Sequence, residues 1–238
     1  MKLALIGYGK MGHELEAIAK ERNHEVVLII DQDNLADLTA EKLSSVDVAL
    51  EFTSPKSAFQ NVLICIEAGK PIVSGSTGWG ERFHEAAELC KRRGGALFYS
   101  SNYSIGVNIF FKVNQLLASL MGKTQGYSVA VEEVHHTQKL DAPSGTAITL
   151  AELMAKELPG MKGWVLAPEK LDNKISITAR REGSVPGTHS VTYSSDVDEI
   201  TFTHAAKSRK GFALGAVLAA EFLKDRKGVF GMNDLLKL

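Results

Sequence analysis

The densest group of reactive side chains in the sequence lies in residues 132–146. It holds two adjacent histidines, His135 and His136, a lysine at Lys139, three carboxylates and a Gly-Thr pair. Histidine is the side chain whose ordinary pKa lies nearest neutral pH, and a positioned histidine or lysine can donate or accept a proton. Because this polar segment stands between an apolar strand and an apolar helix, we expect it to carry the chemistry.

His135 and His136 allow three interpretations. A metal site would need more ligands, and no Cys or His stands at the spacing typical of zinc sites, so we expect no metal. A hydrogen-bonded structural pair is the second. We favour the third, acid–base or substrate-binding work, because Lys139 follows four residues after His135. Serine nucleophiles lack support, since no G-x-S-x-G turn is present.

The end of the same segment, residues 143–146, opens a predicted helix that runs to about Leu158. The first N–H groups of a helix lack partners, and the helix dipole adds partial positive charge there. Gly145 and Thr146 are therefore expected to bind a carboxylate.

A glycine motif stands near the N-terminus, directly after the predicted strand Lys2–Ile6. Residues 7–12 read Gly-Tyr-Gly-Lys-Met-Gly, which is the spacing G-x-G-x-x-G, and a helical pattern follows. Such glycines permit a tight turn, close approach of the backbone to a pyrophosphate, and close packing of helix on strand. We expect this loop to bind a dinucleotide.

Asp31 ends the second predicted strand, Glu25–Ile30, nineteen positions after Gly12. A carboxylate at about this distance accepts hydrogen bonds from the adenosine ribose, and we favour this role over the alternative that residues 31–34 form an ordinary turn. Because Asp31 would repel a 2′-phosphate, it favours NADH over NADPH. Lys10 is the nearby cation that could soften this preference.

Strands and helices alternate through the first hundred residues. Further predicted strands cover 46–52, 71–73 and 96–99, and helices run from Pro55 to about Ala68 and from Glu81 to about Arg92. This alternation predicts a Rossmann-like, doubly wound parallel sheet, whose ligands bind beyond the carboxyl ends of the strands. Loops 51–53, 75–78 and 100–103 would face the cofactor there, or be ordinary turns.

After a predicted hinge at residues 104–106 the pattern changes. Helices are predicted at 107–120, 146–158 and 211–223, and strands at 127–134, 174–180, 188–193 and 199–204. Strands without helices between them predict an open mixed sheet in an α+β substrate domain, with one face covered by self-association. We therefore expect a dinucleotide-binding domain of residues 1–104 and 210–238, and a substrate-binding and oligomerisation domain of residues 105–209.

Composition excludes several classes of protein. The 238 residues carry a formal net charge of −1, so no global field favours nucleic acid or an anionic membrane. No apolar run approaches the roughly 20 residues that span a bilayer, and no signal peptide is evident. Cys65 and Cys90 fall in predicted helices as buried free thiols, which suits a cytoplasmic protein.

The segment Glu133–Ala147 resembles the signature of the bacterial dihydrodipicolinate reductases (4-hydroxy-tetrahydrodipicolinate reductases), E-x-H-H-x-x-K-x-D-A-P-S-G-T-A. Other segments also have counterparts in that family, namely residues 7–12, 75–78, 102–108, 181–189 and 203–209.

The resemblance implies an NADH- or NADPH-dependent reductase of the diaminopimelate route to lysine. The hydride would go to C4 of a cyclic dicarboxylate, with loss of water. Proton handling falls to His135 and Lys139, and carboxylate binding to His136, Gly145 and Thr146. The implied cofactor residues are Gly7, Tyr8, Gly9, Lys10, Met11, Gly12, Asp31, Gly75, Ser76, Thr77, Ser100, Ser101, Asn102 and Tyr103. A homotetramer assembled through the substrate-domain sheets is also implied, and Glu132, Glu133 and Asp141 become supports that orient the loop.

The sequence departs from the family in few places. The glycine loop is one residue shorter than in some members, the acidic residue is Asp31 and not Glu, and Ser100-Ser101 replaces two small apolar residues.

Two rival functions remain. A dehydrogenase of open-chain keto or amino acids gives no reason for Lys139 and Thr146 to converge, and an NADH-binding sensor would need neither His135 nor Lys139.

Overall fold

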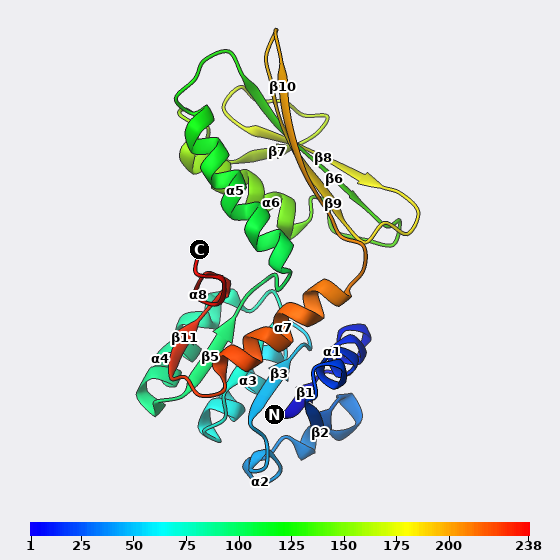
Figure 1. The fold of residues 1–238 in the computed structure, drawn as a ribbon, viewed down its shortest axis with the longest axis vertical. Coiled ribbons are helices and arrows are strands. Elements are labelled where there is room, and N and C mark those ends of the chain that lie inside the picture. Colours follow the sequence, from blue (N-terminus) through cyan, green and yellow to red (C-terminus); the bar gives the residue numbers. More distant parts are fainter. The chain divides into compact units, whose positions relative to one another are not determined.

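The computed structural model describes residues 1–238, which form two compact units (Figure 1). Unit 1 comprises Met1–Ile105 and Arg209–Leu238, and unit 2 comprises Gly106–Ser208. None of the helices is both long enough and apolar enough to cross a bilayer.

Unit 1 is built on a six-stranded sheet in which all neighbouring strands are parallel, in the order β11-β5-β4-β3-β1-β2. The strands are β1 (Lys2–Ile6), β2 (Glu25–Ile30), β3 (Val48–Glu51), β4 (Ile72–Ser74), β5 (Ala96–Tyr99) and β11 (Gly228–Phe230). The chain turns to opposite sides of β1 when it forms β2 and β3. In sheets of this kind the carboxyl edge beside such a reversal is where ligands bind.

Helices cover both faces of this sheet. One face carries α1 (Lys10–Glu21), α7 (Lys210–Leu223) and α8 (Met232–Leu236), and the other carries α2 (Ala40–Leu43), α3 (Ala58–Glu67) and α4 (Phe83–Arg93). Because both faces are covered, the strands are almost continuously apolar, as in the buried Leu3–Ile6. Short 3₁₀ turns, Gln32–Asp37 and Gly80–Arg82, precede α2 and α4.

Unit 2 is a five-stranded mixed sheet in the order β10-β9-β6-β8-β7. Its strands are β6 (Ser128–His135), β7 (Trp164–Leu166), β8 (Ile175–Arg181), β9 (Thr188–Ser194) and β10 (Glu199–Ala205). β6 pairs antiparallel with β9 and parallel with β8. Helices α5 (Ile105–Met121) and α6 (Gly145–Glu157) pack on one face, where Val131, Ile177 and Val191 are buried.

The opposite face of the unit 2 sheet has no helix over it (Figure 1). Side chains alternate along each strand, so Ala130 and Glu132 of β6 and Thr201 of β10 point away from the helices and are exposed. Two hydroxyl pairs join β9 to β10 across this face, Ser190 to Thr203 at 2.8 Å and Thr192 to Thr201 at 2.9 Å.

The predicted fold class, a doubly wound parallel sheet with a second unit built on a mixed sheet, is confirmed. Cys65 and Cys90 are buried free thiols, as expected. The prediction that Pro55 opens a helix is wrong. The helix α3 begins at Ala58, after a turn in which the N–H groups of Ser57 and Ala58 donate to the Ser54 carbonyl. The Ser57 hydroxyl also donates to the Ser54 carbonyl, and such local hydroxyl contacts to the backbone favour a turn over a helix.

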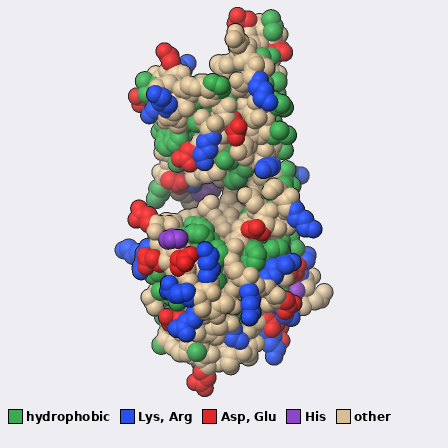
Figure 2. All heavy atoms as spheres, turned by 90° about the vertical axis from the view of Figure 1, so that its left-hand side faces the viewer, with side chains coloured by type: hydrophobic (Ala, Val, Ile, Leu, Met, Phe, Trp, Pro, Cys, Tyr) green, Lys and Arg blue, Asp and Glu red, His purple; other side chains and the backbone are tan.

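The strands β7 and β11 were not predicted, because neither stands in the regular strand–helix alternation that marked the equally short β4. Basic and acidic side chains are interspersed on the face that Figure 2 shows, which agrees with the near-zero net charge.

Candidate active site

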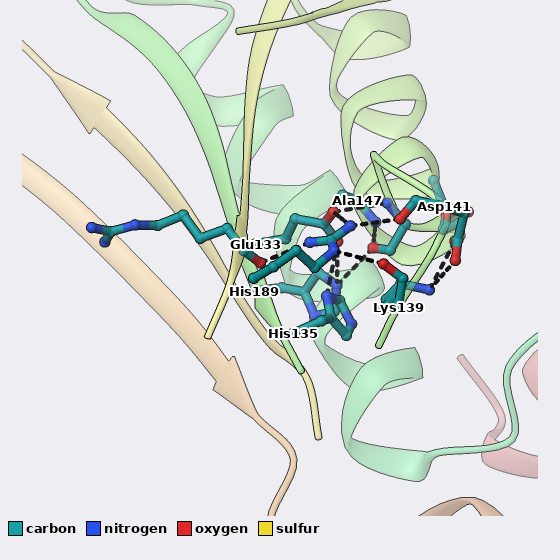
Figure 3. A network of polar contacts seen from close by, with 11 residues as sticks. Glu133, His135, Lys139, Asp141, Ala147 and His189 are labelled. Carbon is teal, nitrogen blue, oxygen red and sulfur yellow. Dashed lines mark hydrogen bonds and ion pairs between the residues drawn. The ribbon is translucent and has the colours of Figure 1, made fainter. Parts of the chain in front are cut away.

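Glu133 is the centre of a buried polar cluster in unit 2 (Figure 3). It is fully buried, on the helix-covered side of β6. Its Oε1 accepts from the Ser144 N–H at 3.0 Å and from Arg181 Nη2 at 3.2 Å, and its Oε2 lies 3.1 Å from His135 Nδ1. A buried carboxylate is tolerated only with such partners. Desolvation opposes the charge, but the close contact with His135 and the hydrogen bonds from Ser144 and Arg181 outweigh it and lower the pKa of Glu133 to about 2.

His135 is two residues further along β6, on the same side of the sheet, and is 8% exposed. Because Nδ1 faces Glu133, its Nε2 is the ring nitrogen left for a ligand. A Cβ at Gly187 would lie 3.0 Å from this Nε2, and Gly187 has a φ of +152°, so only glycine lets the chain pass this closely. The pair therefore has the arrangement in which a carboxylate orients an imidazole.

His189 stands directly opposite Glu133 in the antiparallel pairing of β6 and β9. Its Nε2 lies 3.7 Å from Glu133 Oε2 and 3.1 Å from Ser144 Oγ, and its ring meets that of His135 edge to face. Burial, followed by the charge of His135, lowers the pKa of His189 to about 4. It is therefore neutral near pH 7.

The loop after β6 is braced by Arg181. This side chain donates from Nε to the Lys139 carbonyl at 3.3 Å and from Nη2 to the Asp141 carbonyl. The Lys139 ammonium binds both carboxylate oxygens of Asp141, at 2.7 and 2.8 Å, and the side chain is 20% exposed. This hydrogen bond and the positive charge of Lys139 lower the pKa of Asp141. The loop thus presents a cation whose partner is a more exposed carboxylate, visible at the right of Figure 3.

The helix α6 begins where the loop ends. Ser144 is its N-cap, with Oγ accepting from the Ala147 N–H at 3.3 Å. Gly145 is exposed, and no atom lies within 4 Å of where its Cβ would be, so its backbone is open to a ligand. N–H groups in this first turn have no carbonyl partner within the helix. His136, which is half-buried, has no hydrogen-bond partner at Nδ1.

The glycine loop of unit 1 has the form that a dinucleotide requires. Gly7 has a φ of +96°, and a Cβ there would lie 2.2 Å from the Phe52 carbonyl oxygen. A Cβ at Gly12 would lie 2.5 Å from the Gly7 carbonyl oxygen, whereas at Gly9 it would meet nothing within 4 Å. Gly7 and Gly12 therefore allow close packing, while Gly9 leaves the backbone open at the start of α1. The residues fit a pyrophosphate at this helix N-terminus.

Asp31 follows β2 and is exposed, and its carboxylate forms no ion pair within the protein. Its N–H donates to Asn34 Oδ1 at 2.7 Å, which fixes the backbone at the strand end. The alternative that residues 31–34 form a turn is also met, since a 3₁₀ turn begins at Gln32. An exposed carboxylate on a fixed turn can still receive a ribose.

The other predicted cofactor residues of unit 1 differ in exposure. Thr77 and Ser101 are exposed, whereas Ser76 and Tyr103 are buried. The Tyr103 hydroxyl donates to the Ser74 carbonyl at 2.7 Å, and its ring packs on Phe98. Tyr103 thus supports the sheet edge from within the core.

The structure adds three side chains to the predicted site of unit 2: Ser144, Arg181 and His189. Arg181 joins Glu133 to the backbone at Lys139 and Asp141, while His189 and Ser144 enclose Glu133. Arg181 and His189 are remote in sequence from His135, and only the register of β6 with β8 and β9 brings them to it, whereas Ser144 lies in the same segment as His135. The sequence did offer one signal for His189: it occupies an inward-facing position in the alternating pattern of a strand.

A parallel, doubly wound sheet with an open glycine turn, and a second unit with a Glu–His pair beside a helix N-terminus, define a dinucleotide-dependent α/β oxidoreductase. The chain belongs to the dihydrodipicolinate reductase family. The profile of the family's N-terminal region, "Dihydrodipicolinate reductase, N-terminus", matches residues 1–103, and that of its C-terminal region matches residues 106–236. Enzymes of this family reduce their substrate with NADH or NADPH.

Individual relatives agree along nearly the whole chain. A 4-hydroxy-tetrahydrodipicolinate reductase of Christiangramia forsetii is 50% identical over 99% of this chain and 98% of its own length. One from Methanococcus aeolicus is 34% identical over 98% of this chain and 82% of its own. The predicted family and the predicted activity, an oxidoreductase of lysine and diaminopimelate biosynthesis, are thereby confirmed.

Solved structures support the fold. A dipicolinate-bound dihydrodipicolinate reductase from Paenisporosarcina sp. TG-14 superposes with a TM-score of 0.80 at 24% identity, and covers 98% of both chains. An amine dehydrogenase from Mycobacterium smegmatis has a TM-score of 0.61 at 13% identity over 96% of this chain and 94% of its own.

Proposed function

We propose that His135 and Lys139 handle the protons in the reduction of 4-hydroxy-tetrahydrodipicolinate to tetrahydrodipicolinate. When bound, the nicotinamide supplies a hydride, which adds at C4 of the ring. The C4 hydroxyl leaves as water, so the balanced reaction also takes up one proton. A proton donor is therefore needed beside the ring.

The contact between Glu133 Oε2 and His135 Nδ1, at 3.1 Å, is the observation that carries this proposal. The carboxylate holds the imidazole by Nδ1, so that Nε2 can donate a proton to the departing hydroxyl. Lys139 can exchange Asp141 for a substrate carboxylate, or pass a proton, because its ion pair lies partly in solvent.

The substrate carboxylates would bind His136, Gly145 and Thr146. The open backbone at Gly145 and the positive end of the α6 dipole suit an anion, and Ser144 fixes that first turn. The dipicolinate bound in the Paenisporosarcina structure is a cyclic dicarboxylate of the same kind.

The cofactor would lie on residues 7–12 with its ribose at Asp31, and would reach loops 75–77 and 100–103. We propose a preference for NADH, because the exposed carboxylate of Asp31 disfavours a 2′-phosphate. Lys10 is exposed in the glycine loop of residues 7–12, and its positive charge limits this preference for NADH.

We further propose a homotetramer assembled through the helix-free face of the unit 2 sheet, and a cytoplasmic location. Exposed short side chains on that face, among them Ala130 and Thr201, let a second sheet approach closely. Partners would otherwise be limited to the small substrate, with no nucleic acid and no membrane.

The test is turnover of NADH or NADPH, coupled to the synthase that makes the substrate. His135→Ala and Lys139→Ala are expected to lose at least roughly 100-fold in kcat, the lower end for a positioned acid–base group, while NADH still binds. The exposed His84→Ala and Lys156→Ala are matched controls and keep full activity. Unchanged turnover in both site variants would contradict the assignment.

A further inference from the structure

Glu51 is a second buried carboxylate, which none of the roles above uses. It is the last residue of β3, in unit 1, and is fully buried. No lysine, arginine or histidine forms an ion pair with it. A buried carboxylate without a counter-ion must be stabilised by hydrogen bonds, so the groups that donate to Glu51 indicate its role.

The donors to Glu51 lie at the end of β4 and in the two chain segments that leave β3 and β4. Oε1 accepts from Ser76 Oγ at 2.7 Å and from both the N–H and the hydroxyl of Thr53, at 3.0 and 2.5 Å. Oε2 accepts from Ser74 Oγ at 2.6 Å. One side chain therefore ties the loop after β3 to the loop after β4.

Further contacts make these two loops a single rigid piece. The Thr53 N–H also donates to Ser76 Oγ at 2.8 Å, and Thr53 Oγ1 accepts from Ser57 and from the buried Asn61. The Phe52 ring fills the space beside Gly75, where a Cβ would lie 2.1 Å from it. Since the Phe52 carbonyl also contacts Gly7, the glycine turn and both loops share one packed junction.

We propose that Glu51 is a positioning residue for the dinucleotide, because it fixes loops 52–53 and 75–77 against the glycine turn. Every hydroxyl proton that could otherwise turn toward solvent at Thr53 and Ser76 is directed to this carboxylate. The half-buried Gly75 and the exposed Thr77 are thereby held in one arrangement before the cofactor arrives, which lowers the ordering cost of binding. The inference rests on the proposed function, since it takes these loops to face the cofactor.

Ser74 and Ser76 provide a matched pair of test variants. Both hydroxyls are buried and donate to the same carboxylate at nearly the same distance, but Ser74 lies within β4 whereas Ser76 lies in the loop. Ser74→Ala and Ser76→Ala should lower the urea midpoint by similar amounts. If Glu51 serves only stability, the two variants will behave alike in every assay.

The readout is the Kd of NADH, measured by its fluorescence without substrate. We expect Ser76→Ala and Glu51→Gln to weaken NADH by about 10-fold, in the range of one lost charge-assisted hydrogen bond, and Ser74→Ala by less than about 2-fold. In the Glu51→Gln background, Ser76→Ala should cost little more, because the pair acts as one unit. The kcat at saturating NADH should change by less than about 3-fold in Ser74→Ala.

Equal weakening by Ser74→Ala and Ser76→Ala would overturn the proposal, as would a Glu51→Gln protein that binds NADH normally. If Glu51→Gln does not fold, the two serine variants still decide the question. A wild-type protein that binds neither NADH nor NADPH would refute the proposed function instead, so the two failures are distinguishable.

Discussion

Because His189 is neutral in the folded protein, we expect the free energy of unfolding to depend on pH. Burial beside His135 lowers its pKa from 6.5 to about 4, so the unfolded chain takes up this proton at a higher pH than the folded chain does. Below pH 6.5 protonation therefore favours unfolding, and the stabilisation is complete only above that pH. At about 1.4 kcal/mol per pH unit, the full difference is about 3 kcal/mol, of which about 2 kcal/mol is lost between pH 7 and pH 5.

Urea denaturation at pH 7, 6 and 5, at one protein concentration, measures this loss. His189→Gln removes the titrating group and keeps an amide beside Ser144, so its free energy of unfolding should fall by about 2 kcal/mol less than that of the wild type over this range. His84→Gln, at an exposed position on α4, is the control and should follow the wild type. Glu133 titrates in a lower pH range, from 4.5 to about 2, and does so in the wild type and in both variants. Parallel curves for wild type and His189→Gln would refute the reasoning.

Two further predictions concern single positions. Gly187→Ala should lower the free energy of unfolding, measured by urea denaturation, by about 1–3 kcal/mol, because Gly187 has a φ of +152° and a Cβ there would lie 3.0 Å from His135 Nε2. The variant should also have a lower kcat. A fully active, equally stable variant would show that the close approach is unimportant. Asp31→Ala should raise the KM for NADH by several-fold more than that for NADPH, since one hydrogen-bonded carboxylate contributes about 1–3 kcal/mol, and equal changes would argue against a ribose contact.

Local pattern was enough to predict most of the architecture. The glycine turn, the alternating strands and helices, and the helix start at Ser144 are encoded within short segments. The partners of His135 were not predictable in this way. Arg181 and His189 lie on strands whose pairing with β6 is a long-range event, and sequence spacing carries no register for it.

The two acidic supports, Glu51 and Glu133, illustrate the same limit. Both stand in strands that read as apolar or mixed, and nothing nearby in sequence tells a buried carboxylate from an exposed one. Burial of Glu51 depends on the hydroxyls of a neighbouring strand, and that of Glu133 on Arg181 and the start of α6. The sequence predicted Glu133 as a support of the loop, and the structure shows how it acts.

The order in which the chain is made has a consequence for its folding. Helix α7 supplies Ala213, Ala216, Val217, Ala220 and Leu223 to the core on one face of the unit 1 sheet, and β11 completes an edge of that sheet. On the ribosome, the first 105 residues therefore emerge with this face covered only by α1, and all of unit 2 follows before α7 appears. Unit 2 is continuous in sequence and can fold as soon as it is synthesised. The nucleotide-binding sheet is thus the last part to be completed, and during synthesis it is the part most exposed to aggregation and chaperones.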